Sequence, residues 1–144
     1  MIQLKTHDDI LRIKDASAIL TTTFLELEKA LDEGITTKEL DNIAKHLIES
    51  KGAKPAFLGY FNYPASICIS INKEVIHGIP GKRKLKKGDI VSIDIGVNLQ
   101  GFFSDCAMTY AIGNIATVQN IIKGMNTTSL IIQNVNSKSI FIIY

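Results

Sequence analysis

The stretch from Ile90 to Tyr110 constrains the fold most, because it has the pattern of a β-hairpin. Its first arm is rich in β-branched residues, its second arm is rich in aromatic residues, and Asn98 and Gly101 bracket a short turn between them. An even loop centred between positions 99 and 100 pairs position 98 with 101, 96 with 103, and Asp94 with Asp105. The Cβ atoms of these two acids would then lie roughly 5 Å apart. Carboxylates this close repel each other unless a proton or a cation lies between them.

Strand alternation divides the first arm of this hairpin into two faces. It places Ser92, Asp94 and Gly96 on one face and only apolar side chains on the other, namely Val91, Ile93, Ile95 and Val97. The pattern predicts a metal site built on a sheet. It also fits a solvated polar face on which both acids lie in water, and a single β-bulge would turn Asp105 away. Spacing alone leaves both interpretations open.

The composition of the 144 residues is that of one ordinary globular domain, with 46% hydrophobic and 21% charged residues. A net charge of +2 gives no general case for a nucleic-acid partner. The basic run at 82–87 favours a solvated loop over a polyanion-binding patch. We find neither a secretory signal nor an apolar run of the roughly 18 residues that a membrane helix needs. We therefore expect a cytoplasmic protein with no membrane partner and with Cys68 and Cys106 reduced.

Two helices are expected ahead of the first strand. Thr6 can be the N-cap of the first helix, and Asp9, three residues later, is favoured by the positive end of the helix. Gly34 is expected to end this helix. The second helix begins at the capping box Thr36–Glu39 and ends near position 51. The apolar faces recur at spacings of three and four, at Ile10, Ile13, Ser17, Leu20, Phe24, Leu27 and Leu31 in the first helix and at Leu40, Ile43, Leu47 and Ile48 in the second.

The chain changes character after these helices. Pro55–Pro64 is a turn-rich aromatic loop, and Ile67–Asn72 alternates as a strand does. Residues 74–77 are expected to form a short strand that ends in a loop at His77, beside Gly78. Taken alone, this is most simply an ordinary loop histidine. The order of two helices, an aromatic loop and several strands predicts an α+β fold in which the helices cover one face of an antiparallel sheet.

Three segments carry a family resemblance, Phe57–Asn72, Val75–Pro80 and Gly88–Asp94. Together they resemble type I methionine aminopeptidase, in the same order and over about residues 2–114. The resemblance implies half of a pita-bread (creatinase/aminopeptidase-like) fold and a complete site with two divalent metal ions, Co, Mn, Fe or Zn. It also implies a hydrolase that removes the N-terminal initiator methionine of nascent polypeptides with a metal-activated water.

The same resemblance implies a role for seven residues. Asp94 would chelate one metal ion, and Asp105 would bridge both. His77 would bind the substrate backbone near the scissile bond and help to stabilise the reacting centre. The pocket for the methionine side chain would be lined or bordered by Phe57, Tyr60, Tyr63 and Cys68. The chemistry agrees, because carboxylate oxygens suit such ions and a thioether packs well against aromatic rings.

The second part of the sequence departs from the family pattern. The family site needs one further histidine and two glutamates, yet no Asp, Glu or His follows Asp105. Residues 125–144 are dominated by Ile, Asn, Ser and Thr, with Lys138 the only charge. We therefore predict that residues 1–114 are the N-terminal half of a metallo-aminopeptidase catalytic domain and that residues 115–144 are an atypical tail, truncated or read out of frame. The chain alone is expected to bind metal weakly, to lack useful peptidase activity and to self-associate through uncovered sheet surface.

Two alternatives remain. A non-catalytic pita-bread relative would bind partners without metal, but it would have no reason to keep Asp94, Asp105 and His77 together. A related metallopeptidase that acts at proline would share the fold, and only the resemblance of Tyr60, Tyr63 and Cys68 favours methionine over proline.

Overall fold

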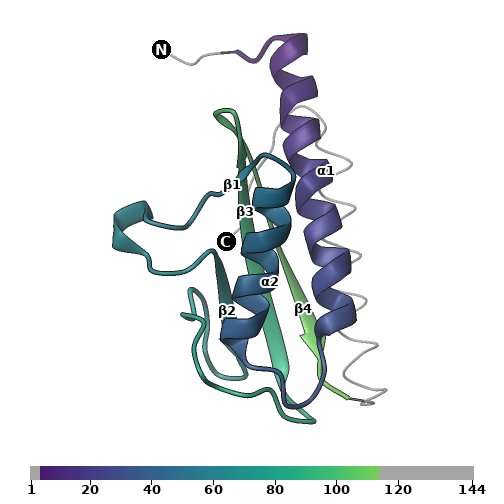
Figure 1. Ribbon diagram of the computed structural model, residues 1–144, viewed down its shortest axis with the longest axis vertical. Coiled ribbons are helices and arrows are strands. Elements are labelled where there is room, and N and C mark those ends of the chain that lie inside the picture. Colours follow the sequence, from purple (N-terminus) through teal and green to yellow (C-terminus); the bar gives the residue numbers. More distant parts are fainter. Residues whose placement is uncertain (1–3, 114–144) are drawn as a thin grey trace.

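The computed structural model describes residues 4–113, which form two helices packed on one face of an antiparallel sheet (Figure 1). The elements, in chain order, are α1 (His7–Ala30), α2 (Thr37–Ser50), β1 (Lys54–Pro55), the short 3-10 helix η1 (Tyr60–Asn62), β2 (Ile67–Ile71), β3 (Ile90–Leu99) and β4 (Phe102–Ala111). The predicted α+β class and the helix-on-sheet arrangement are confirmed. No helix in residues 4–113 is long and apolar enough to cross a membrane. The tail predicted at 115–144 lies outside the described residues.

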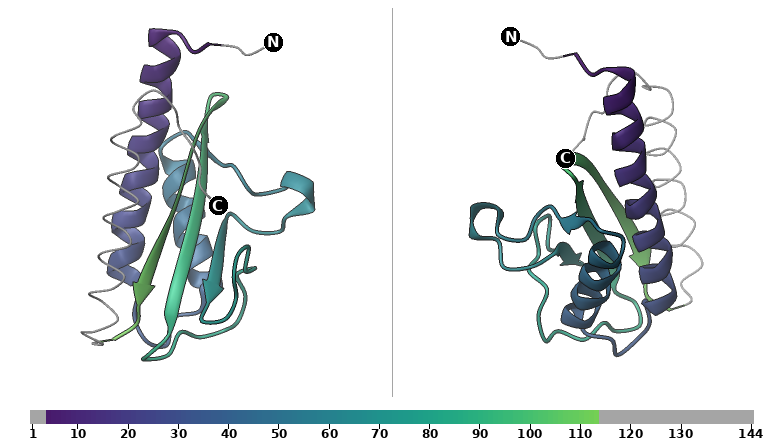
Figure 2. Two further views of the ribbon diagram at one scale, coloured as in Figure 1. Left: turned by 180° about the vertical axis from the view of Figure 1, so that it is seen from behind. Right: turned by 45° about the horizontal axis from the view of Figure 1, so that its top comes forward.

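The sheet is built around β3. Strand β4 pairs with one edge of β3, whereas β1 and β2 pair one after the other along its opposite edge, and every pairing is antiparallel. Helix α1 packs on β3 and β4, and α2 packs on β1 and β2. Seen from behind, the sheet lies in front of both helices, so no helix among the described residues covers this second face (Figure 2, left). We call it the open face, and we call the other one the helical face.

Both helices begin at the predicted cap residues, and both caps are capping boxes, although such a box was predicted only for the second helix. The hydroxyl of Thr6 accepts a hydrogen bond from the Asp9 N–H at 3.1 Å, and that of Thr36 accepts one from the Glu39 N–H at 3.1 Å. Each acid in turn accepts a hydrogen bond from the backbone N–H of its cap residue. Helix α1 ends at Ala30, earlier than predicted from Gly34, which instead lies in the following turn with a φ of 94°.

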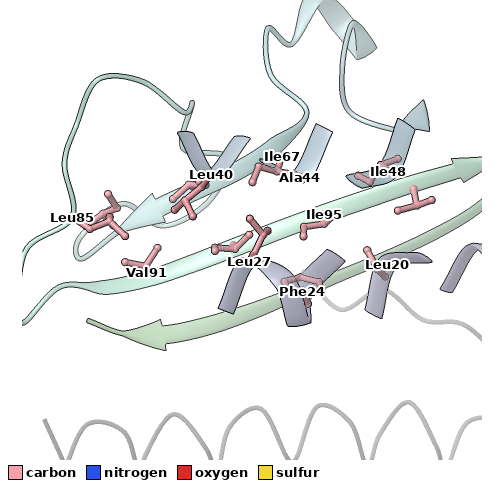
Figure 3. Packing of buried hydrophobic residues seen from close by; sticks show 14 of the residues in the cluster. Leu20, Phe24, Leu27, Leu40, Ala44, Ile48, Ile67, Leu85, Val91 and Ile95 are labelled. Atoms are coloured by element: carbon pink, nitrogen blue, oxygen red, sulfur yellow. The ribbon is translucent and has the colours of Figure 1, made fainter. Parts of the chain in front are cut away.

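The helical face carries the core. Val91, Ile93 and Ile95 of β3 are 0% exposed, and Leu20, Phe24 and Leu27 of α1 and Leu40 and Ile48 of α2 pack against them (Figure 3). The predicted apolar stripe of α1 is confirmed from Leu20 onwards. Ile10 is 43% exposed, because the first turns of α1 extend past the end of the sheet (Figure 1). The stripe prediction was therefore wrong at that residue.

The hairpin register differs from the prediction by two residues. Gln100 and Gly101 form the turn, both with positive φ (53° and 89°), and Leu99 pairs with Phe102. Asp105 therefore pairs with Gly96, and Asp94 pairs with Ala107, so the predicted direct pairing of the two acids is wrong. A shift of two residues keeps every side chain on its face. Asp94 and Asp105 thus remain on the same open face, as diagonal neighbours.

The connection from β2 to β3 is a loop, so the short strand predicted at 74–77 is wrong. The backbone of this loop holds the start of α2, because the Thr37 N–H donates to the Arg83 carbonyl and the Lys38 N–H donates to the Gly81 carbonyl. All five cationic side chains of the basic run at 82–87 are exposed, as the prediction of a solvated loop requires.

Candidate functional site

The two acids of the hairpin meet on the open face. Strand alternation points Asp94 of β3 and Asp105 of β4 to the same side of the sheet, and Gly96 is the direct cross-strand partner of Asp105. Burial, reinforced by the negative charge of Asp105, raises the pKa of Asp94 to about 7. Burial also raises the pKa of Asp105 above its usual range. Because the charge of one acid raises the pKa of the other, the two diagonal neighbours titrate as a pair rather than independently.

One carboxylate oxygen of this pair is buried without a hydrogen-bond donor among the described residues. Asp105 Oδ1 is buried, and no N–H or O–H group of residues 4–113 donates a hydrogen bond to it. Such an oxygen strongly favours a proton or a cation beside it, because a buried acceptor without a partner costs about 1–3 kcal/mol. Carboxylate oxygens are the ligands that hard divalent ions prefer. The pair therefore fits a divalent cation, which was one of the two interpretations that the spacing left open.

The described residues supply only part of a metal centre. Within residues 4–113, no group of three or more His, Cys, Asp or Glu side chains gathers in a way that could hold an ion. Catalytic metal sites usually have three protein ligands and one open position. Two carboxylates thus account for part of such a set, and further ligands have to come from beyond this hairpin.

Cys68 and Tyr63 lie beside the acid pair. Cys68 of β2 is the cross-strand partner of Asp94 and is 5% exposed. The Tyr63 hydroxyl lies 3.1 Å from the carbonyl oxygens of both Ile67 and Gly78. Burial raises the pKa of the Cys68 thiol and that of the Tyr63 phenol, and the charge of Asp94 raises both further. Both side chains therefore stay neutral, and the surface that they form beside the acid pair is polarizable and uncharged.

Phe57 covers the sheet next to Asp105. A Cβ atom built on Gly96 would lie 2.6 Å from Cε1 of the Phe57 ring, so the ring packs directly on the backbone of this glycine. Since Gly96 is the partner of Asp105, the ring borders the acid pair. The absence of a side chain at position 96 leaves the space that this aromatic ring needs.

The other two predicted site residues lie further out. Tyr60 is 66% exposed and packs edge-on against Phe61, with ring centroids 4.6 Å apart, in the arm that projects from the body (Figure 1). His77 is exposed with a φ of 56°, and the neighbouring Gly78 accepts a hydrogen bond from the Ile69 N–H of β2 at 2.9 Å. Strand β2 therefore lies between this backbone and β3. The structure brings Phe57, Tyr63 and Cys68 to the acid pair and holds Tyr60 and His77 at the margin.

Asp41 is a residue that the sequence analysis missed. Its carboxylate is 2% exposed and accepts hydrogen bonds from the backbone N–H groups that begin β2. The signal was present in the helix pattern, since Thr37, Leu40, Asp41, Ala44 and Ile48 share the buried face of α2. An acid at a buried position of an amphipathic helix requires partners, and that requirement could have identified it.

Comparison with known proteins agrees with this architecture. The family model for metallopeptidase family M24 matches residues 12–133, beyond the boundary expected at 114. The fold and the paired acids on a sheet thus define a metallopeptidase class, and the chain belongs to metallopeptidase family M24.

Within that family, the chain is similar to methionine aminopeptidases. It is 54% identical over 114 residues to the enzyme of Borreliella burgdorferi, which covers 79% of this chain and 45% of that protein. It is 49% identical over 116 residues to methionine aminopeptidase 1 of Bacillus subtilis, with 81% and 47% covered. The crystal structure of methionine aminopeptidase from Rickettsia prowazekii superposes with a TM-score of 0.81 at 35% identity, over 85% of this chain and 50% of that one. The chain spans about half the length of the relatives it matches, and half of a pita-bread fold is confirmed.

Proposed function

We propose that this chain supplies the N-terminal half of a methionine aminopeptidase site, with Asp94 and Asp105 as two of its metal ligands. The buried carboxylate pair carries the proposal, since Asp105 Oδ1 has no hydrogen-bond partner within the described part of the chain. The methionine aminopeptidases among the relatives support methionine over proline as the residue removed. Residues 1–114 as the catalytic half and 115–144 as an atypical tail remain a prediction, as does self-association through the open face.

The residues around the pair each have a task in this proposal. Phe57, Tyr63 and Cys68 form a neutral wall for a thioether side chain next to the acids, which suits the polarizable sulfur of methionine. Tyr60 would close that pocket from the projecting arm, and His77 would donate a hydrogen bond to the substrate backbone. Divalent ions held by the acids would supply an activated water and polarise the scissile carbonyl. Co, Mn, Fe and Zn all remain candidates for the resident metal.

Activity would require ligands from outside the described hairpin. Two carboxylates alone hold a divalent ion weakly, because a chelate gains strength with every further ligand that the protein fixes in place. We therefore expect no useful release of methionine from a Met-Ala peptide by the purified chain. Robust release that a chelator abolishes would contradict this.

The experiment joins residues 1–113 to the part of the Bacillus subtilis relative that this chain does not match. The fusion should release methionine from Met-Ala and leave Ala-Pro intact. Asp94→Asn and Asp105→Asn should each lower kcat/KM on the order of a thousandfold, because each removes a metal ligand. Asp8→Asn is the matched control, since it removes an equal charge from an exposed acid of α1 that pairs with Arg12. An active fusion that keeps its activity in Asp94→Asn would refute the assignment.

A non-catalytic binding module is the second candidate, favoured by the lack of a third ligand among the described residues. Manganese binding by the full chain, followed by electron paramagnetic resonance, separates the two. The metal-site proposal expects weak binding that Asp94→Asn abolishes and Asp8→Asn leaves unchanged. A module without a metal role expects no difference between these two variants.

A further inference from the structure

Asp41 joins helix α2 to the beginning of β2. Its Oδ1 accepts hydrogen bonds from two consecutive backbone N–H groups, that of Ser66 at 2.7 Å and that of Ile67 at 3.2 Å. Its Oδ2 accepts a hydrogen bond from Lys38 Nζ at 2.7 Å, one turn earlier on the same helix. The Asp41 side chain is 2% exposed, whereas that of Lys38 is 50% exposed. The carboxylate is therefore buried with both oxygens occupied, which a charged group needs in order to be stable away from water.

The backbone that Asp41 holds is also held from a second side. The Tyr63 hydroxyl lies 3.1 Å from the carbonyl oxygen of Ile67, so this residue is contacted at its N–H by Asp41 and at its carbonyl by Tyr63. Cys68 comes next and is the cross-strand partner of Asp94. The path from Asp41 to the acid pair thus runs through the backbone of Ile67 and Cys68, two consecutive residues of β2.

The placement of this acid favours a positioning role over a general contribution to stability. Ser66 and Ile67 stand where the aromatic loop turns into β2, so their backbone sets the direction in which the strand starts. Without Asp41, two buried N–H groups would have no acceptor, and such groups favour local opening to water. Opening at this point would move Tyr63 and Cys68 first, because they flank the freed backbone.

We propose that Asp41 is a positioning residue for the pocket wall beside the acid pair, and that it fixes Tyr63 and Cys68 through the backbone of Ser66 and Ile67. The identity of the pocket as a methionine site rests on the proposed function, but the positioning does not. The negative charge of Asp41 also acts directly on the Tyr63 hydroxyl and the Cys68 thiol. The positioning effect itself passes through the backbone hydrogen bonds at the start of β2.

The test uses the full chain and needs no peptidase activity. Cys106→Ser leaves Cys68 as the only thiol, since the sequence has two cysteines. In that background, Asp41→Ala should raise the rate at which Ellman's reagent labels Cys68 at least about tenfold, because local opening exposes a buried group. Asp41→Asn should stay within about threefold of the parent, because its amide oxygen still accepts from both N–H groups. Rescue by this variant would show that the acceptor matters and the charge does not.

Asp89→Ala is the matched control for lost stability. Asp89 is also a buried carboxylate, and it accepts hydrogen bonds from the Lys86 N–H and the Asn72 amide in the loop before β3. It should destabilise the chain without speeding the labelling of Cys68 beyond about threefold. If Asp41→Ala fails to fold, Asp41→Ser serves in its place, because its shorter side chain does not reach the Ser66 and Ile67 N–H groups. Labelling of the Asp41 variant no faster than that of Asp89→Ala, or equally fast labelling of Asp41→Asn, would overturn the proposal. Faster labelling of the Asp41 variant, together with an active fusion that keeps its activity in Asp94→Asn, would support the positioning and refute the proposed metal-site assignment.

Discussion

The two faces of the sheet differ in how fully their side chains are satisfied. On the helical face, Val91, Ile93, Ile95 and Val97 of β3 are all 0% exposed against α1 and α2. On the open face, the same strand presents Asp94, whose pKa is raised to about 7 by burial and by Asp105. Period-two alternation thus gives one strand an apolar side that needs only packing and a polar side that needs a ligand.

This difference separates what stabilises the fold from what performs chemistry. The helical face stabilises the fold through the hydrophobic effect, which grows with the apolar area removed from water and does not require groups to point in a particular direction. The open face holds two coupled acids and a buried oxygen without a partner, which costs stability until a proton or a cation arrives. A structure that keeps such a pair is consistent with selection for binding at that place.

The largest effect is expected from a substitution on the helical face. Ile93→Ala should lower the free energy of unfolding by about 2–5 kcal/mol, because it removes buried methylene groups and leaves a cavity. Phe103→Ala on the open face is the control, since Phe103 is 57% exposed, and it should cost less than about 1 kcal/mol. Urea denaturation of both variants measures the difference. Equal losses would mean that the two faces are equally buried in solution, and the comparison would fail.

Many features of the fold were predictable from residues that are close in sequence. Thr6 and Thr36 cap helices through contacts three residues away, and the faces of β3 follow from alternation alone, so neither depends on distant parts of the chain. The hairpin register depends on which residues adopt positive φ. Gln100 does so although it is not a glycine, and the sequence gives little sign of that. Because the error was two residues, the shared face of Asp94 and Asp105 was predicted correctly while their direct pairing was not.

Features that depend on tertiary contacts were harder to predict. The segment at 74–77 was predicted to be a short strand, but it pairs with no strand among residues 4–113 and is a loop. Asp41 gains its role from the N–H groups of Ser66 and Ile67, about 25 positions further along the chain. Propensity and periodicity describe neighbours in sequence, and they carry no information on which backbone will need an acceptor after folding.

A second substitution tests whether the open face is covered at Phe57. Gly96→Ala should lower the free energy of unfolding by about 1–3 kcal/mol, because its Cβ would lie 2.6 Å from the Phe57 ring and 3.0 Å from Ala56 Cβ. Combining it with Phe57→Ala should recover part of that loss, since the two changes share one contact. Chemical denaturation of the two single variants and the double variant measures the coupling. A neutral Gly96→Ala would show that the ring moves aside easily and does not line the site.

The smallest effect is expected from pH and isolates the acid pair. The pKa of Asp94 is about 7 in the folded chain and about 3.8 otherwise, so between these values the folded state binds more protons than the unfolded one. This contribution to stability is fully present below about pH 4 and is lost as the pH rises through 7. Because the pair is partly solvated, the loss should amount to about 1–2 kcal/mol, less than the pKa difference alone would give.

Urea denaturation at several pH values without divalent ions measures this slope. Replacing both acids, Asp94→Asn together with Asp105→Asn, should flatten it, because burial raises the pKa of each carboxyl group and an amide does not titrate. Asp8→Asn should leave it unchanged, since Asp8 is exposed on α1 away from the open face. A slope that persists in the double variant would assign the pH dependence to other groups. The open face would then hold two solvated acids rather than a coupled pair that requires a ligand.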